Sequence, residues 1–126
     1  MDISIKFSDV DFSPFLGLKV TEVTPIGVEL INIKFENGNL NVECPWRLRH
    51  RSGILVGSTE QPGNDFISIL KKHLLRAPIT NIYHFDPTED LIIEFNKELY
   101  LDLFADSTAF EQYQLYEGES LFLIGK

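Results

Sequence analysis

Cysteine is nearly absent from the sequence. Cys44 is the single cysteine among 126 residues, so no disulfide can form within the chain and a reducing compartment is expected. No apolar run approaches the ~20 residues that span a bilayer. The opening residues, MDISIKFSDVDF, lack the basic and then apolar order of a signal peptide. These absences predict a cytoplasmic protein with no membrane partner.

Recognisable catalytic and ligand-binding motifs are missing as well. The three histidines, His50, His73 and His84, stand far from one another and from Cys44, which excludes the usual zinc spacing. Neither a Gly-x-Ser-x-Gly motif nor a glycine-rich phosphate loop is present. The acidic turn at residues 86–90 lacks the helix-loop-helix frame of a calcium site. We therefore expect no catalytic residue, no metal site and no cofactor, although two carboxylates that meet in a cleft would escape such a search.

Positive charge is scarce in the last third of the chain. From residue 86 onward there are ten carboxylates against Lys97 and Lys126, so this segment carries the whole formal charge of −8. Residues 1–85 are balanced, with nine acidic and nine basic side chains. The ten carboxylates belong to Asp86, Glu89, Asp90, Glu94, Glu98, Asp102, Asp106, Glu111, Glu117 and Glu119. Such an uneven field favours a cationic partner and disfavours nucleic acid.

One basic group runs against this trend. Arg47, Arg49, His50 and Arg51 follow one another closely and would be the best candidates for a nucleic-acid surface. The acidic segment would oppose phosphate binding by the same molecule. We therefore expect these cations either to be solvated or to pair with the protein's own acidic strands.

Short strands separated by turns account for most of the chain. Apolar patterning predicts strands at Leu18–Val23, Val28–Phe35, Leu40–Leu48, Ile54–Val56, Ile79–Phe85, Leu91–Phe95, Leu99–Phe104, Tyr113–Tyr116 and Leu121–Ile124. Asn37-Gly38 is the strongest hairpin signal, because both residues tolerate the positive φ of a type I′ turn. Pro45 requires an edge position or a bulge in its strand.

One amphipathic helix is expected at about residues 65–76. Phe66, Ile69, Leu70, His73 and Leu74 recur at spacings of three and four and so share one face. Basic side chains crowd the last turns, where they suit the helix dipole, and the proline at position 78 ends the helix.

The strand-rich segments on either side of this helix resemble each other. Leu40–Glu43 aligns with Leu99–Asp102, and Trp46–Arg49 aligns with Tyr113–Tyr116. The sequence therefore predicts a single α+β domain, predominantly antiparallel β, with two similar four-stranded units joined by one helix. An internal duplication of residues 15–58 and 77–125 and a chance likeness between short strands both stay open.

The candidate site lies on the acidic strands after residue 86. We predict a partner-binding set of Asp86, Glu89, Asp90, Glu94, Tyr100 and Asp102. If the leucines of the two strands face the core, alternation places Glu94, Tyr100 and Asp102 together on the opposite face. The turn that carries the other three residues of the set lies beside this face. Carboxylates next to an aromatic ring suit a cationic protein. The alternative is a sheet packed on both faces, with acids only at its rims.

Two stretches, CPWRLR at residues 44–49 and GILVGS at residues 53–58, suggest a family. With the later order of DLIIEF at 90–95, the strand at 99–104 and a final Gln114-Leu115 strand, they resemble small bacterial immunity proteins. Such proteins occur beside polymorphic toxins and contact-dependent growth-inhibition systems. The resemblance covers roughly residues 15–125, and Tyr113 stands where similar proteins often carry tryptophan. No catalytic residues come with this family.

The resemblance implies a protein that binds and neutralises a cognate toxin. Because this chain is acidic, we expect a basic toxin domain, such as an RNase or DNase. Two alternatives stay open. One is a binding or scaffold module that self-associates through an exposed strand edge such as Leu121–Ile124. The other is a small-molecule site or an enzyme between the two halves. The oligomeric state is not predicted.

Overall fold

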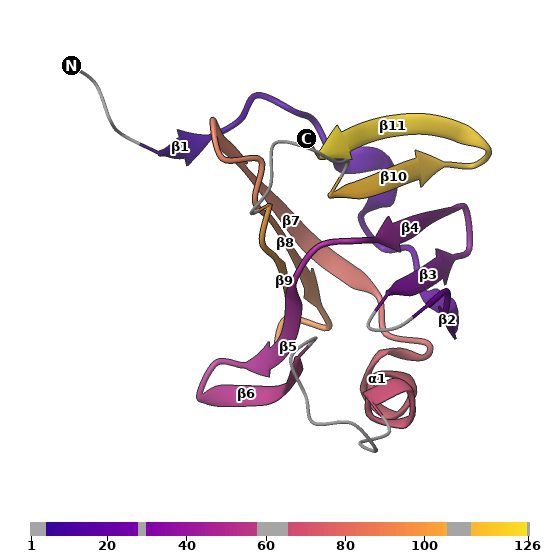
Figure 1. Cartoon of the computed structure of the whole chain (residues 1–126). Helices are drawn as coiled ribbons and strands as arrows, with labels where there is room; N and C mark the ends of the chain where they lie inside the picture. Colours follow the sequence, from indigo (N-terminus) through magenta and orange to yellow (C-terminus); the bar gives the residue numbers. More distant parts are fainter. Residues whose placement is uncertain (1–4, 28–29, 58–65, 106–111, 126) are drawn as a thin grey trace.

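The computed structural model describes residues 5–27, 30–57, 66–105 and 112–125, which form two antiparallel sheets and one α-helix (Figure 1). One sheet has the order β1 (Lys6–Phe7), β7 (Ile79–Asp86), β8 (Leu91–Phe95), β9 (Leu99–Leu103), β5 (Trp46–His50) and β6 (Gly53–Gly57). The other has the order β11 (Ser120–Gly125), β10 (Tyr113–Glu117), β4 (Gly38–Val42), β3 (Ile31–Phe35) and β2 (Val20–Pro25). The helices are η1 (Ser13–Phe15), a 3-10 turn, and α1 (Phe66–Leu74). The predicted α+β class, mainly antiparallel β, is confirmed.

Each sheet combines strands from both halves of the chain. The meander β7-β8-β9 is extended by the hairpin β5–β6, and the meander β2-β3-β4 is extended by the hairpin β10–β11. The two halves have therefore exchanged their hairpins, instead of forming the two separate four-stranded units expected from the sequence. β4 and β9 each end the meander of their sheet, and β10 and β5 are the hairpin strands that pair with them. The same two pairs of strands, β4 with β9 and β5 with β10, align in the sequences of the two halves. A duplication as the origin of this likeness stays a prediction.

The predicted strand Leu40–Leu48 is wrong as one element, because the chain changes sheets within it. β4 ends at Val42 and β5 begins at Trp46 in the other sheet. Pro45 lies between them, where its missing N–H costs no ladder hydrogen bond. Its carbonyl oxygen accepts the Phe104 N–H at 2.9 Å, which fixes the start of β5 beside the end of β9.

The hydrophobic core is one continuous cluster of buried side chains from both sheets. Alternation along β8 turns Leu91, Ile93 and Phe95 inward, and the inward residues of the other strands meet them. The helix α1 contacts β2 and β6, one strand from each sheet, and adds the buried Leu70 and Leu74 to the core. The inner faces of both sheets are therefore covered, and their outer faces are the surfaces that can meet a partner.

The helix is confirmed, although it is shorter than the predicted span of about 65–76. Its last residue is Leu74, and Arg76 has a φ of 68°, a left-handed conformation that ends the helix before the proline. Within the described chain, no helix is long and apolar enough to cross a membrane.

Candidate protein-binding face

The two sheets present different outer faces to solvent. On β3 and β4, Asn32 Nδ2 donates to Asn39 Oδ1 at 3.2 Å and to Asn41 Oδ1 at 2.6 Å, so amide groups satisfy one another there. The equivalent outward positions of β8 and β9 carry Ile92 and Tyr100 beside two carboxylates. Exposed rings and aliphatic groups gain free energy when a partner covers them, whereas a paired amide ladder does not. The six-stranded sheet is therefore the candidate surface.

The aromatic face is the name we give to the outward side chains of that sheet. It consists of Phe7, Arg47, Arg49, Ile54, Tyr83, Phe85, Ile92, Glu94, Tyr100, Asp102 and Phe104. Phe7 and Ile54, at its two ends, are 64% and 63% exposed. The Phe7 ring lies 5.1 Å from that of Phe85 and 6.0 Å from that of Tyr83, measured between centroids. The rings at the β1 end thus form one contiguous apolar area.

A buried carboxylate fixes the centre of the aromatic face. Asp102 Oδ2 accepts hydrogen bonds from Arg47 Nε and from Arg49 Nε, both at 2.6 Å, and its Oδ1 accepts one from Arg49 Nη2 at 3.2 Å. The Asp102 side chain is 3% exposed, against 40% for Arg47 and 27% for Arg49. The hydrogen bond with Asp102 raises the pKa of Arg49. Of the two alternatives left open for the basic cluster, solvation or pairing with the acidic strands, the structure shows pairing for Arg47 and Arg49.

Both guanidinium groups also lie over aromatic rings of the same face. Arg47 Cζ is 5.0 Å from the centroid of Phe104, and Arg49 Cζ is 4.6 Å from the centroid of Tyr100. Stacking and charge-assisted hydrogen bonds together remove much of the rotamer freedom of these long side chains. A partner that binds here would therefore meet arginines that are already ordered.

The structure brings Glu94, Tyr100 and Asp102 together on one face, as alternation predicted, but they do not form a free acidic surface. Glu94 Oε2 accepts a hydrogen bond from Thr80 Oγ1 at 2.7 Å, and Asp102 is enclosed by its two arginines. The solvent-facing charge at the centre belongs to the guanidinium groups. Any contribution of Asp102 to partner binding would act through the arginines that it holds in place.

Asp86 is the last residue of β7, and Glu89 and Asp90 follow it in the β7–β8 turn, at one end of the aromatic face. Asp86 is exposed, whereas Asp90 Oδ1 accepts the Ala105 N–H at 2.8 Å. The Glu89 carbonyl accepts a hydrogen bond from the hydroxyl of Tyr113 at 2.8 Å, and burial raises the pKa of that phenol. Of the three, Asp86 is the carboxylate most open to a partner.

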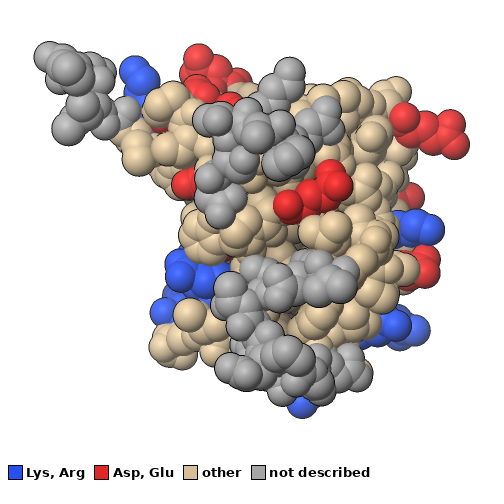
Figure 2. Space-filling model, in the orientation of Figure 1, with Lys and Arg blue, Asp and Glu red and all other residues tan. Residues whose placement is uncertain are grey.

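The remaining carboxylates of the last third are placed at other turns. Glu98 lies between β8 and β9, at the opposite end of β8 from the Asp86 turn, and Glu117 and Glu119 lie at the β10–β11 turn of the other sheet. Asp106 and Glu111 fall outside the described residues. Figure 2 accordingly shows Asp and Glu atoms at several separate places on the side it displays. The negative charge is therefore a property of the whole molecule more than of one patch.

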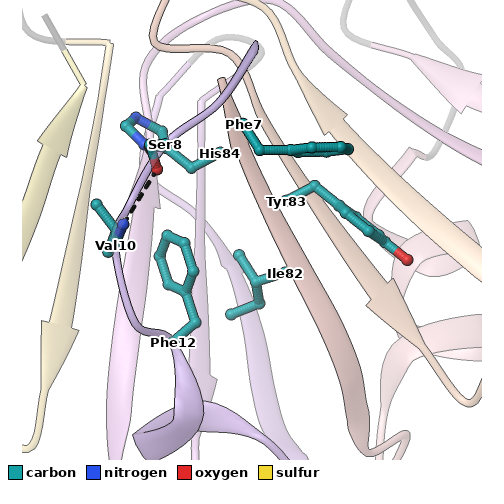
Figure 3. Close-up of a pocket in the computed structure, with 7 residues that line it drawn as sticks. All are labelled: Phe7, Ser8, Val10, Phe12, Ile82, Tyr83 and His84. Atoms are coloured by element: carbon teal, nitrogen blue, oxygen red, sulfur yellow. Dashed lines mark hydrogen bonds between the residues drawn. The ribbon is translucent and has the colours of Figure 1, made fainter. Parts of the chain in front are cut away.

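Sequence reasoning missed a cluster that joins the N-terminal segment to β7. Ser8 Oγ lies 2.7 Å from His84 Nδ1, and His84 Nε2 lies 3.6 Å from Glu89 Oε1. Figure 3 shows the Ser8 hydroxyl beside the His84 ring, in a pocket of about 270 Å³ that Phe12 also lines. These residues are 76 positions apart in sequence, and no motif announces them.

The order serine, histidine and carboxylate resembles that of a nucleophilic triad. A nucleophilic serine also needs N–H donors directed at the oxyanion that forms. The N–H of Ser8 instead donates to the His84 carbonyl at 2.8 Å, and the N–H of Val10 points to Ser8 Oγ itself at 3.4 Å. Both of these N–H groups are thus engaged, and the contact between Ser8 and His84 joins the N-terminal segment to β7.

A second pocket lies where the aromatic face meets the Asp86 turn. Its volume is about 250 Å³. Its lining consists of Ile5, Arg47, Arg49, Phe85, Asp90, Ile92, Asp102, Leu103 and Phe104. This pocket therefore contains both the ordered arginines and one predicted residue of the turn.

Two further findings bear on the candidate site. Among residues 5–27, 30–57, 66–105 and 112–125, no three His, Cys, Asp or Glu side chains gather in a way that could hold a metal ion. Comparison of the chain with protein families, with characterised proteins and with solved structures finds no match.

Proposed function

We propose that this chain is a non-enzymatic inhibitor of the immunity-protein kind, which binds a cognate toxin domain through the aromatic face. The observation that carries the proposal is the make-up of the aromatic face, which exposes Phe7 and Ile54 at its two ends and holds ordered arginines between them. The outer face of the five-stranded sheet instead carries paired asparagine amides at its centre, with Leu121 exposed on its β11 edge. Tyrosine, phenylalanine and arginine are enriched at protein interfaces. The inner side of this sheet packs on the core, so its backbone is already ordered and loses little conformational freedom when a partner binds the side chains of the outer side.

The charge of the molecule supports a cationic partner. A net charge of −8 accelerates the approach of a basic protein over a range set by the Debye length. Nuclease domains are such proteins, because their clefts hold a polyanion. Asp86 adds local negative charge at the rim of the aromatic face, where exposed charges affect association rate more than the lifetime of a complex.

A protein partner accounts for the arginines better than a nucleic acid does. Phosphate binding requires guanidinium groups that can release counterions, and here Asp102 already neutralises part of the charge of Arg47 and Arg49. The approach of a polyanion would also be opposed by the net charge. Self-association through the aromatic face is the second candidate, and sedimentation velocity over a wide range of concentration would reveal it.

The proposal predicts that a toxin domain is encoded beside the gene for this chain, and that domain is the binding partner in the test. We expect the double variant Phe7→Ser/Ile54→Ser to bind that domain about 100-fold more weakly by biolayer interferometry, because both exposed apolar ends of the face are lost. Inhibition of the domain's nuclease activity should fall in parallel. Leu121→Ser, which changes a 49% exposed leucine on the other sheet, is the matched control and should bind normally. Equal binding by the double variant and the control would contradict the proposal.

A further inference from the structure

The pocket between the aromatic face and the Asp86 turn has the size of a single side chain. Its volume of about 250 Å³ is below the ~300 Å³ at which pockets for small-molecule ligands begin. Apolar side chains supply much of its wall, namely Ile5, Phe85, Ile92, Leu103 and Phe104. Such a pocket on a binding face is suited to one anchoring residue of a partner.

The charged residues of the lining balance one another. Two guanidinium groups, of Arg47 and Arg49, face two carboxylates, of Asp90 and Asp102. A charged occupant would lose hydration without a net opposite charge to compensate. The lining therefore favours an uncharged occupant, in contrast to the acidic surface expected from the sequence.

Two groups in the lining can bind an aromatic side chain that carries a polar hydrogen. One can stack on its ring, and the other can accept its hydrogen bond. Arg47 has Phe104 beneath one side of its guanidinium, and its side chain is 40% exposed, so a second ring can stack on the open side. Within the part of the chain that the structure describes, the carboxylate of Asp90 accepts one hydrogen bond, from the Ala105 N–H, whereas an ionised carboxylate can accept about four. An N–H or O–H donor near this wall would therefore find a charged acceptor.

We propose that this pocket receives one tryptophan or tyrosine side chain of the protein partner, with the ring on Arg47 and the polar hydrogen donated to Asp90. The inference rests on the proposed function and deepens it, because it names the residue class that anchors the partner on the aromatic face. Rings with a polar hydrogen are the commonest anchors of protein interfaces.

Indole is the probe for this pocket, and it needs no partner protein. In 1H–15N spectra of the full chain, we expect indole in the millimolar range to shift the amide signals of Ile92, Leu103 and Ala105 and the Nε signal of Arg47. 1-Methylindole has the same ring without the N–H donor and should bind about tenfold more weakly, since a hydrogen bond to a carboxylate is lost. Equal affinities, or shifts confined to His84 and Val10 in the other pocket, would overturn the inference.

Two carboxylates of the same turn provide a matched pair of variants. Asp90→Asn keeps an acceptor for the Ala105 N–H but removes the charge, so indole should lose most of its advantage over 1-methylindole. Asp86→Asn changes an exposed carboxylate that does not line the pocket and should leave both affinities unchanged. Phe104→Ala, which removes the ring beneath Arg47, should weaken both ligands. An unchanged preference for indole in Asp90→Asn would remove Asp90 from the site.

The two proposals can fail separately. If Phe7→Ser/Ile54→Ser abolishes toxin binding while indole does not enter the pocket, the aromatic face stands and the anchor is wrong. If indole binds as expected while the face variants leave toxin binding unchanged, the pocket stands and the proposed function is wrong.

Discussion

Asp102 shows how far the role of one acidic residue can differ from its contribution to net charge. The carboxylate sits on the outer side of a sheet, yet its oxygens take hydrogen bonds from Arg47 and Arg49 and only 3% of its side chain is exposed. A bidentate charge-assisted pair of this kind is stronger than an exposed ion pair. The residue therefore acts in ordering the aromatic face, and its charge is hidden from a partner.

We predict that Asp102→Asn lowers the free energy of unfolding by about 2–3 kcal/mol. Loss of one partner from a fully buried ion pair costs about 3–5 kcal/mol, and the partial exposure of both arginines reduces that figure because water can reach them. Urea unfolding at neutral pH measures the change. Asp86→Asn, an exposed carboxylate on β7, is the control and should unfold as the parent does. A midpoint for Asp102→Asn equal to that of the control would show that the pairing of Asp102 with Arg47 and Arg49 contributes nothing to stability.

At the scale of elements, α1 is linked to β5 by a pair of histidines. The rings of His50 and His73 lie 6.0 Å apart, edge to face. Burial lowers the pKa of His73 below its ordinary value of 6.5, and the positive charge of Lys72 and the neighbouring His50 lower it further. The folded state thus favours neutral His73, so this histidine takes up its proton at a higher pH in the unfolded chain than in the folded protein.

We predict that His73 makes part of the stability depend on pH. Because its pKa is depressed by folding, its contribution is complete above about 6.5 and is lost as pH falls through the folded-state pKa. As the pH falls from 7 to 5, the free energy of unfolding of the parent should therefore decrease more than that of His73→Phe. In Lys72→Gln the shift should be smaller, since one cause of the low pKa is removed. Parallel pH curves for parent and His73→Phe would contradict the assignment.

The elements set by local sequence were predictable, and those set by distant contacts were not. The periodicity from Phe66 to Leu74 predicted α1, and Asn37-Gly38 predicted the β3–β4 hairpin. The type I′ turn expected there is wrong, because Gly38 has a φ of 138° but already belongs to β4, and Asn37 does not have a positive φ. Strand alternation also placed Tyr100 on the outward face. Pro45 indicated an irregularity in its strand, but that the chain leaves one sheet for the other there depends on pairing with β9 and β10, which the local sequence does not show.

The same limit explains the candidate site. Arg47 meets Asp102 across 55 positions of sequence, so a count of charges could not show that this carboxylate is enclosed. The cluster of Ser8 and His84 spans 76 positions and escaped for the same reason. Composition gave the sign of the total charge, whereas the sign of each surface depends on which strands become neighbours.

For the whole molecule, the exchange of hairpins makes the two halves depend on each other. The β5–β6 hairpin pairs with β9, and the β10–β11 hairpin pairs with β4, so neither sheet is complete within one half. An isolated hairpin is marginally stable in water, and a three-stranded meander without its neighbour exposes an apolar face and an open edge. Unfolding should therefore be a single cooperative transition, although the sequence looks like two units.

We predict that residues 1–60 and residues 61–126, produced as separate fragments, are each unfolded and assemble only together. Each fragment alone lacks the strand that its hairpin pairs with, while a mixture can rebuild both sheets and the continuous core between them. The 1H–15N spectrum of either fragment should show little dispersion, and an equimolar mixture should regain the dispersed signals of the full chain. Substitution of Leu101 by Asp in the second fragment should prevent this recovery, because that side chain is buried beside β5. Tyr116→Asp, a change at a partly exposed position of β10, is the control and should still allow assembly. A first fragment that folds alone would show that its own strands suffice for a core, and would contradict the exchanged arrangement as the source of stability.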